Sequence, residues 1–441
     1  MRRPILPVVL VSLSVVSSPS HAAQAVELGK RYIDPAHGFS LRPPLDTVRR
    51  RGFSTARLVS WSRQEAKTGA ILWTLSVRQV TTKDKQADLK KYSRELETRL
   101  TREKKFRVES VRIVPLAGKG AIDVKGITAG PIRLWERQVW ILPEPGRFLI
   151  FAMAGPTDAS KRLDKICSQI LATVTLTDPK AAREQLAQNL ARGRELLASL
   201  NDNKLSKAVT KEPQWFLLTH KGKDVGFMHV AESWGRLERM EGVTVKTCVM
   251  LQMPKDKRRV LRRSLFSTAR GNFERWREHL LVGGGPAAVG TTEEGLKKAD
   301  MIVCGITRGG NSSTRKKKVP KSIYLPRAIG WQMFRLVDLT KPARYAFASY
   351  ASLENNFDMR TFAVIGTEKI ATVRGEVQAV RATDQAAANT EPATLWLSPD
   401  GKLLRMKSAD GLVMNASARG AVLRRYPKAK AVVSAPTGHK K

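Results

Sequence analysis

The sequence predicts an α+β protein with two folded units that follow an export signal. Three observations support this class. Apolar residues that alternate with polar ones, typical of half-buried strands, recur along most of the chain. Two amphipathic helical segments interrupt the first group of strands, and one apolar helical segment interrupts the second. The chain has 441 residues and is 42% hydrophobic, which is enough for packed cores in two to three domains.

The first 25 residues have the pattern of a cleavable signal peptide. Arg2 and Arg3 precede an apolar stretch at 5–16, and the small residues that follow predict cleavage after Ala22 or Ala25. The apolar stretch is shorter than the ~20 residues that span a bilayer, and no later segment has that length and apolarity. We therefore expect an exported protein, periplasmic or extracellular, without a transmembrane segment in the mature chain. A buried N-terminal helix is the alternative.

The first unit, residues 29–178, is expected to be an α/β/α sandwich with an antiparallel sheet. Helices with one apolar stripe each are predicted at 85–105 and 159–174. An order of strands, helix, strands and helix is typical of such a sandwich. Strands are predicted at 38–43, 56–61, 70–80, 108–114, 120–126, 133–142 and 147–154.

A linker helix is predicted at 179–203, with Asp178 as its N-cap. The second unit, residues 214–427, is mostly strands interrupted by one helix at 326–338. This pattern suggests one curved antiparallel sheet that the crossing helix closes on its concave side. The basic residues 428–441 are predicted to be a disordered tail. Strands of this unit are predicted at 215–220, 224–233, 243–253, 257–267, 273–282, 301–307, 360–365, 370–381, 394–397, 402–407 and 412–418.

Residues 29–178 resemble the PsbP-like α/β/α sandwich family. The resemblance rests on the order of elements and on the motif Tyr32-x-Asp34-x-x-x-Gly38-Phe39-Ser40-x-x-Pro43. Residues 44–46 lack the aromatic side chain that such domains often have there. The resemblance implies an accessory or protein-binding module and not an enzyme, with Phe39 packing in the core and Pro43 ending a strand.

Residues 214–427 are similar to exported bacterial proteins with one curved sheet, such as the lipoprotein carrier LolA and related domains of unknown function. The similarity rests on the succession of strands, the crossing helix and the hairpin at 396–404. It implies a concave face that shelters an acyl chain or another apolar ligand.

Positive charge is spread over the whole chain. Lys and Arg number 78 against 39 Asp and Glu, a net charge of +39. Residues 26–200 contain 33 basic and 18 acidic side chains, and residues 201–441 contain 43 and 21. Such a surface attracts nucleic acid, acidic polysaccharide or an anionic membrane. A general basic bias of exported proteins is the alternative explanation.

The densest positive charge lies in two clusters, one on a hairpin and one in a loop rich in Ser, Thr and Gly. If the clusters converge, they form a polyanion site through charge alone, although no aromatic platform for single-stranded nucleic acid accompanies them. Scattered solubilising loops are the alternative. The hairpin cluster is Lys255, Lys257, Arg258, Arg259, Arg262 and Arg263; the loop cluster is Arg315, Lys316, Lys317, Lys318 and Lys321.

The sequence has no local motif for catalysis, a metal or a cofactor, and we expect none of the three. Its six histidines lack metal-binding spacing, and no Gly-x-Ser-x-Gly motif or phosphate loop occurs. Cys167 lies on an apolar helical stripe. Cys248 and Cys304 lie in separate predicted strands, and a disulfide between them is one alternative. At 274–278, strand alternation places two arginines on one face, which we interpret as a solvated or ion-paired face.

The leading hypothesis is a non-enzymatic exported protein that binds an apolar ligand or an envelope protein. The alternative is a surface protein that binds polyanions through its basic loops. An enzyme with a noncontiguous active site ranks third.

Overall fold

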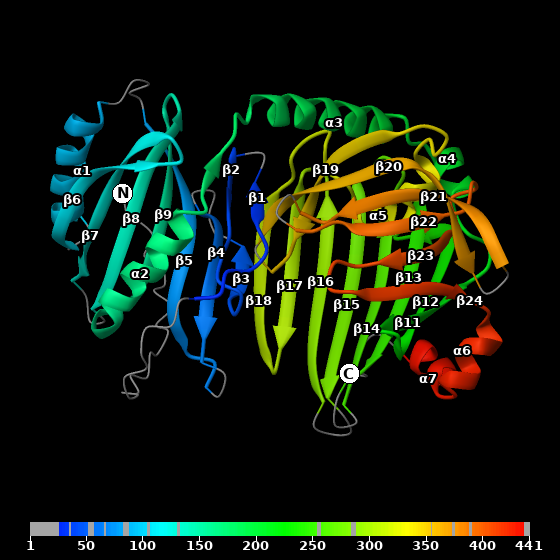
Figure 1. Cartoon of the computed structure of the whole chain (residues 1–441). Helices are drawn as coiled ribbons and strands as arrows, with labels where there is room; N and C mark the ends of the chain where they lie inside the picture. Colours follow the sequence, from blue (N-terminus) through cyan, green and yellow to red (C-terminus); the bar gives the residue numbers. More distant parts are fainter. Residues whose placement is uncertain are drawn as a thin grey trace. The chain divides into compact units, whose positions relative to one another are not determined.

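The chain divides into two compact units, Met1–Ala182 and Arg183–Lys441, in the computed structural model (Figure 1). Each unit combines antiparallel strands with a few helices, which confirms the α+β class. The predicted signal peptide and both cleavage positions lie outside the described residues. The structure describes residues 26–34, 37–51, 57–65, 68–82, 88–103, 106–129, 133–253, 257–283, 288–353, 355–372, 375–387 and 390–435.

A seven-stranded antiparallel sheet organises the N-terminal unit, in the spatial order β3-β4-β5-β9-β8-β7-β6. The strands pair in sequence order from β3 to β5 and from β6 to β9, and β9 lies beside β5. The strands are β3 (Val48–Arg51), β4 (Arg57–Gln64), β5 (Ile71–Thr81), β6 (Phe106–Leu116), β7 (Lys119–Thr128), β8 (Leu134–Glu144) and β9 (Arg147–Pro156).

The two helices of this unit cover opposite faces of the sheet. The core beneath α1 (Leu89–Glu103) contains Phe148 of β9. The core beneath α2 (Ser160–Leu171) contains the next residue, Leu149. Successive side chains of a strand point to opposite faces, so each helix covers its own face. This arrangement confirms the predicted α/β/α sandwich.

The residues of the PsbP-like motif lie in a small three-stranded sheet. Phe39 is 1% exposed, and its ring centroid lies 5.8 Å from that of Phe151. Gly38 has a φ of +70°, and a Cβ there would lie 2.4 Å from the Thr177 carbonyl oxygen, so the turn requires glycine. The small sheet contains β1 (Tyr32–Asp34), β2 (Phe39–Leu41) and β10 (Thr175–Leu176).

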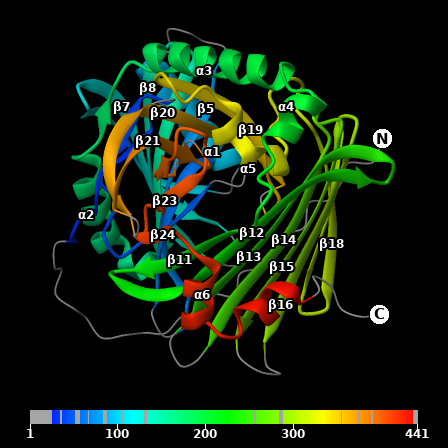
Figure 2. The same ribbon diagram turned by 90° about the vertical axis from the view of Figure 1, so that its right-hand side faces the viewer.

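One antiparallel sheet of fourteen strands forms the C-terminal unit and curves around α5 (Figure 2). β11 is the first strand of the unit. It pairs with β12 and also with β24, the last strand, so the two ends of the strand succession lie side by side in the sheet. This topology confirms the single curved sheet. The strands are β11 (Gln214–His220), β12 (Lys223–Leu237), β13 (Met240–Gln252), β14 (Arg258–Ser267), β15 (Phe273–Gly283), β16 (Val289–Lys298), β17 (Met301–Arg308), β18 (Asn311–Lys318), β19 (Ala343–Ala351), β20 (Asn356–Thr372), β21 (Gly375–Gln385), β22 (Ala393–Leu397), β23 (Leu403–Lys407) and β24 (Leu412–Ser417).

Three of these strands have sequences that do not predict a strand. β16 and β18 are polar or basic along most of their length, and β19 contains four alanines, so their two-residue hydrophobic period is weak. The predicted strand at 370–381 instead covers the end of β20 and the start of β21, which pair with each other. Pairing with neighbouring strands compensates for these weak local preferences.

The predicted linker helix at 179–203 is α3 (Lys180–Ala198), followed by α4 (Asp202–Lys207). Asp178 is the expected N-cap, since its carboxylate accepts a 2.9 Å hydrogen bond from the Lys180 N–H. α3 packs closely on β19 within the C-terminal unit, because a Cβ at Gly193 would lie 2.2 Å from the Ala346 carbonyl oxygen. None of the helices in the described residues is long and apolar enough to cross a membrane.

The predicted crossing helix is α5 (Arg327–Leu336), which lies on the concave inner face of the sheet. At its C-terminal end, the Arg335 Nη2 donates to both carboxylate oxygens of Glu232, at 2.6 and 2.7 Å. The two side chains are 8% and 1% exposed. Arg335 also donates a 2.6 Å hydrogen bond to the Ala208 carbonyl oxygen. These contacts fix one end of the helix. The buried residues of α5 in the main core are Ala328, Ile329, Met333, Phe334 and Leu336.

The prediction of a disordered tail at 428–441 is wrong for its first part, which forms a helix on the outer face of the sheet. Ala429 shares a core with Phe227, and the Arg262 Nε donates a 3.0 Å hydrogen bond to the Val432 carbonyl oxygen. Apolar burial and this hydrogen bond hold a segment whose charge had suggested disorder. The C-terminal helices are α6 (Arg419–Arg425) and α7 (Ala429–Ser434).

All three cysteines are buried free thiols. Cys248 lies in the outer-face core that α7 covers, and Cys304 lies in the inner-face core, so these two residues cannot pair. Burial raises the pKa of Cys248 to about 11 and that of Cys167 and Cys304 to about 12. The C-terminal unit therefore has no disulfide between Cys248 and Cys304.

Replacing Glu232 with Gln should destabilise the C-terminal unit by about 3–5 kcal/mol, because it leaves the buried Arg335 charge without a carboxylate. The matched control is Glu241→Gln, which removes an exposed pair with Arg236 and should cost less than about 1 kcal/mol. Urea unfolding monitored by tryptophan fluorescence measures both changes. Equal losses in the two variants would show that the buried pair does not hold α5.

Removing residues 428–441 should make the Cys248 thiol reactive while Cys167 and Cys304 stay protected, because α7 covers Cys248 alone. The rate of reaction with a thiol reagent under native conditions, followed by peptide mass spectrometry, identifies the labelled residue. If Cys248 reacts no faster than in the full chain, α7 does not protect it.

Candidate functional site

A network of ion pairs occupies the middle of the inner face, beneath the start of α5. Arg327 pairs with Glu278 and, at 2.9 Å, with Glu293, and its guanidinium lies 4.5 Å from the centre of the Trp276 ring. Glu278 also accepts a 3.0 Å hydrogen bond from Arg263. The network therefore fixes the N-terminal end of α5.

Glu274 extends this network toward one end of the sheet. Its carboxylate accepts 2.6 Å hydrogen bonds from the Tyr324 hydroxyl and from the Arg327 backbone N–H. Burial raises the pKa of Glu274, and these hydrogen bonds oppose that rise. Every carboxylate of the network thus has partners that stabilise its charge, which is typical of a structural ion-pair network.

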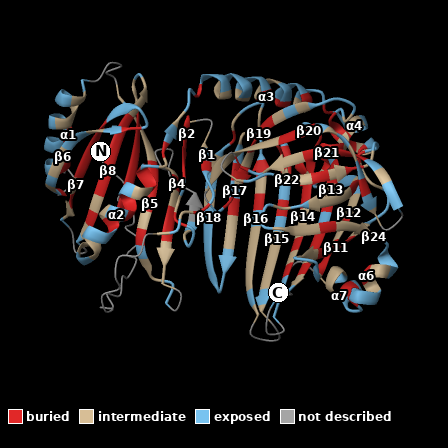
Figure 3. Ribbon diagram, viewed as in Figure 1, coloured by how far each residue is buried: buried red, intermediate tan, exposed pale blue. Residues whose placement is uncertain are grey.

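The neighbouring part of the inner face is apolar and is not covered by α5. We call it the inner-face patch. Figure 3 shows intermediate and exposed residues in the far halves of β15 and β16, whereas the halves near α5 contain buried ones. Val282 and Val289 pair directly across these strands and are 40% and 54% exposed. The inner-face patch consists of Val249, Leu251, Leu261, Leu280, Val282, Val289 and Ile306.

Strand register places these seven side chains in adjoining rows. Val249 pairs with Leu261, and Leu261 pairs with Leu280. Arg259 pairs with Val282 in the next row, whereas Arg308 of β17 lies in the first row, where it pairs with Thr291 beside Leu280. Both arginines are exposed and lie on the inner face. The patch thus presents apolar surface with two cations beside it.

The hairpin cluster divides into exposed and structural cations. Lys257, Arg258 and Arg259 are exposed at the start of β14. Arg262 is 9% exposed and bonds to α7, and Arg263 pairs with Glu278. Lys255 lies outside the described residues. Three of the described cations are therefore available to a ligand at this end of the sheet.

The second cluster lies on a strand and not in the predicted loop. β18 is an edge strand of the sheet, and its lysines hinder pairing with another strand. Lys316 and Lys318 are exposed, and Arg315 donates hydrogen bonds of 2.8 and 2.6 Å to the Ser352 and Leu353 carbonyl oxygens. Lys317 is half-buried on this strand, and Lys321 is exposed just after it.

The structure does not bring the two clusters together. Three strands lie between β14 and β18. Arg258 also lies at one end of β14, whereas Lys317 lies level with Ser267 at the other end, about 30 Å away along the strand. A single polyanion site built from both clusters is excluded for the described residues.

Sequence reasoning missed the buried network and the inner-face patch. The alternation of Glu274, Trp276 and Glu278 is visible in the sequence, but their partner Arg327 is about fifty residues away. The interpretation of 274–278 is otherwise consistent with the geometry, since Arg275 and Arg277 form exposed ion pairs of 2.6 Å with glutamates. In the described residues, no group of three or more His, Cys, Asp or Glu side chains is arranged to hold a metal ion.

No protein-family model and no curated protein matches this sequence. Among solved structures, the chain is similar to a β-barrel-like protein of the domain of unknown function DUF1849 from Brucella abortus, with 11% identity and a TM-score of 0.35 over 46% of this chain and 94% of that one. It is also similar to the solution structure of cyanobacterial PsbP (CyanoP) from Synechocystis sp. PCC 6803, with 11% identity and a TM-score of 0.27 over 36% and 98% of the two chains. The similarity of residues 214–427 to LolA-like proteins stays a prediction.

Proposed function

We propose that this protein is an exported, non-enzymatic binding protein whose C-terminal unit binds an anionic amphiphile, a molecule with one long apolar chain and a negatively charged head. The proposal rests on the inner-face patch, where apolar side chains of five adjoining strands lie beside the filled core, and Val282 and Val289 are the most exposed of them. Contiguous exposed apolar surface is uncommon on soluble proteins and typically marks a binding site.

Charge complementarity favours an anionic head over a neutral one. Arg259 and Arg308 lie on the same face as the patch, and Arg258 lies at its rim. Burying about eight methylene groups at about 0.8 kcal/mol each supplies about 6 kcal/mol before the cost of association. An ion pair with an arginine adds to this and orients the chain.

The proposed binding site of the apolar ligand is therefore a different part of the concave face from the one that the sequence suggested. α5 and its core fill the region that was expected to shelter the ligand. The patch lies beyond the ion-pair network, at the ends of β14, β15 and β16 that are farthest from α5. The ligand chain would lie along this end of the sheet.

Replacing Val289 with Asp should weaken the binding of a fluorescent long-chain fatty acid at least about tenfold, because it places a negative charge in the patch. The matched control is Val303→Asp, on the outer face of β17 with 37% exposure, and it should leave the affinity unchanged. Fluorescence titration, with a neutral long-chain alcohol as competitor, measures the preference for the anionic head.

Equal affinities of the two variants would contradict the proposal. If dextran sulfate binds as tightly as the fatty acid, and both variants bind it normally, polyanion binding through Lys257 and Arg258 is the better account. Such binding should weaken steeply with salt.

Export is the second part of the proposal and rests on the sequence pattern of residues 1–25. When the full chain is expressed in a bacterium with a Sec pathway, the mature protein should begin at Ala23 or Val26. N-terminal sequencing of the periplasmic fraction checks this. A protein that keeps Met1 and stays in the cytoplasm would contradict export without affecting the ligand proposal.

A further inference from the structure

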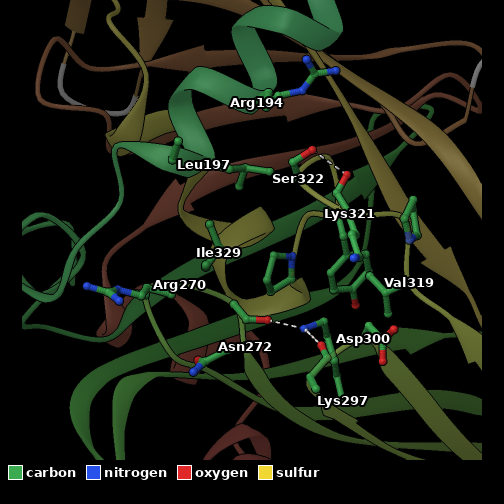
Figure 4. Close-up of a pocket in the computed structure, with 17 residues that line it drawn as sticks. Arg194, Leu197, Arg270, Asn272, Lys297, Asp300, Val319, Lys321, Ser322 and Ile329 are labelled. Atoms are coloured by element: carbon green, nitrogen blue, oxygen red, sulfur yellow. Dashed lines mark hydrogen bonds between the residues drawn. The ribbon is translucent and has the colours of Figure 1, made fainter.

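A pocket of about 400 Å³ opens at the other end of the inner face, on the far side of the ion-pair network (Figure 4). Its walls come from α3, the β14–β15 turn, the β16–β17 turn, the segment after β18 and the start of α5. Leu197, Val319 and Ile329 supply apolar wall. The pocket is therefore built from five separate segments of one compact unit.

The charges around the pocket are mostly positive. Arg194, Arg270, Lys297 and Lys321 line it, against one carboxylate, Asp300. Asp300 lies 3.9 Å from Lys318, which is outside the pocket lining. Among the described residues, Arg194, Arg270 and Lys321 have no carboxylate within ion-pair distance. The positive charge of the pocket is thus not balanced from within the protein.

Lys297 is a buried, charged side chain in the wall of this pocket. It is 6% exposed, and its ammonium donates hydrogen bonds of 2.5 and 2.7 Å to the Gly271 and Ala299 carbonyl oxygens. An ammonium has three N–H donors, so two carbonyls leave one for a ligand. Glu274 pairs with Lys297 across the strands, but its carboxylate oxygens accept hydrogen bonds from other groups.

Burial of this positive charge is unfavourable and lowers the pKa of Lys297, although Glu274 and Asp300 act to raise it. A bound anion would offset that cost. A singly charged carboxylate would leave most of the surrounding cations unbalanced, whereas a phosphate dianion matches more of them and offers three acceptor oxygens. The volume exceeds that of inorganic phosphate, and the apolar wall suits a small organic substituent.

We propose that this cationic pocket binds a small phosphate monoester, with the phosphate on Lys297 and the substituent against Leu197 and Ile329. The site is independent of the amphiphile proposal, because the two lie at opposite ends of the inner face. Val289→Asp should therefore leave it unchanged.

Calorimetric titration with phenyl phosphate, inorganic phosphate and benzoate at low ionic strength tests the site. We expect phenyl phosphate to bind most tightly. Lys321→Ser and Arg270→Ser, both at exposed positions, should each weaken its binding several-fold, and Lys297→Met should weaken it at least about tenfold. The matched control is Lys316→Ser, which removes an exposed cation of β18 outside the pocket lining and should leave the binding unchanged.

Absence of binding to the wild-type protein would overturn the inference. Binding that the Lys297, Lys321 and Arg270 variants retain would overturn it as well, because the ligand would then lie elsewhere on the basic surface. Lys297→Met is accompanied by a thermal unfolding curve, and the two exposed variants keep the test valid if that variant does not fold.

Discussion

Paired charges inside a concave sheet determine how the C-terminal unit is built. Glu232, Glu278 and Glu293 point into the curve of the sheet, where an unpaired carboxylate would cost several kcal/mol. Each meets an arginine of α5, Arg327 at its start or Arg335 at its end. Apolar packing alone tolerates many positions of a short helix, whereas these ion pairs select one position and one direction.

The position of α5 in turn divides the inner face into two ends. On β15, Glu274 lies at one end, Glu278 lies beneath α5, and Val282 lies at the other end, about 27 Å from Glu274. The cationic pocket lies at the first end and the inner-face patch at the second. One sheet thus presents two surfaces of different chemistry, and the ion-pair network separates them.

The elements with a strong hydrophobic period could be predicted from the sequence. The strand at 243–253 and the helix at 326–338 lie where alternation and three-to-four-residue spacing placed them. β18 could not be predicted, because its lysines suit an edge strand and give no apolar period. α7 was missed for a similar reason, since charge and small side chains concealed its apolar side.

The two candidate sites could not be predicted from local sequence patterns, because each combines residues from several separate segments of the chain. Leu261, Leu280 and Val289 form one surface only when β14, β15 and β16 pair in register, and β16 has no strand signal of its own. The pocket draws on five segments between Arg194 and Ile329. The basic clusters were visible as charge, but only the structure separates exposed cations such as Arg258 from structural ones such as Arg262.

The central claim is that an apolar chain lies on the inner-face patch and not under α5 or on the outer face. Photo-crosslinking with a fatty acid that carries a diazirine within its chain tests it directly, with labelled peptides identified by mass spectrometry. If the apolar chain lies on the inner-face patch, peptides that contain residues 249–261 and 280–289 will be labelled. Labelling confined to the outer face, to α5 or to the N-terminal unit would contradict it.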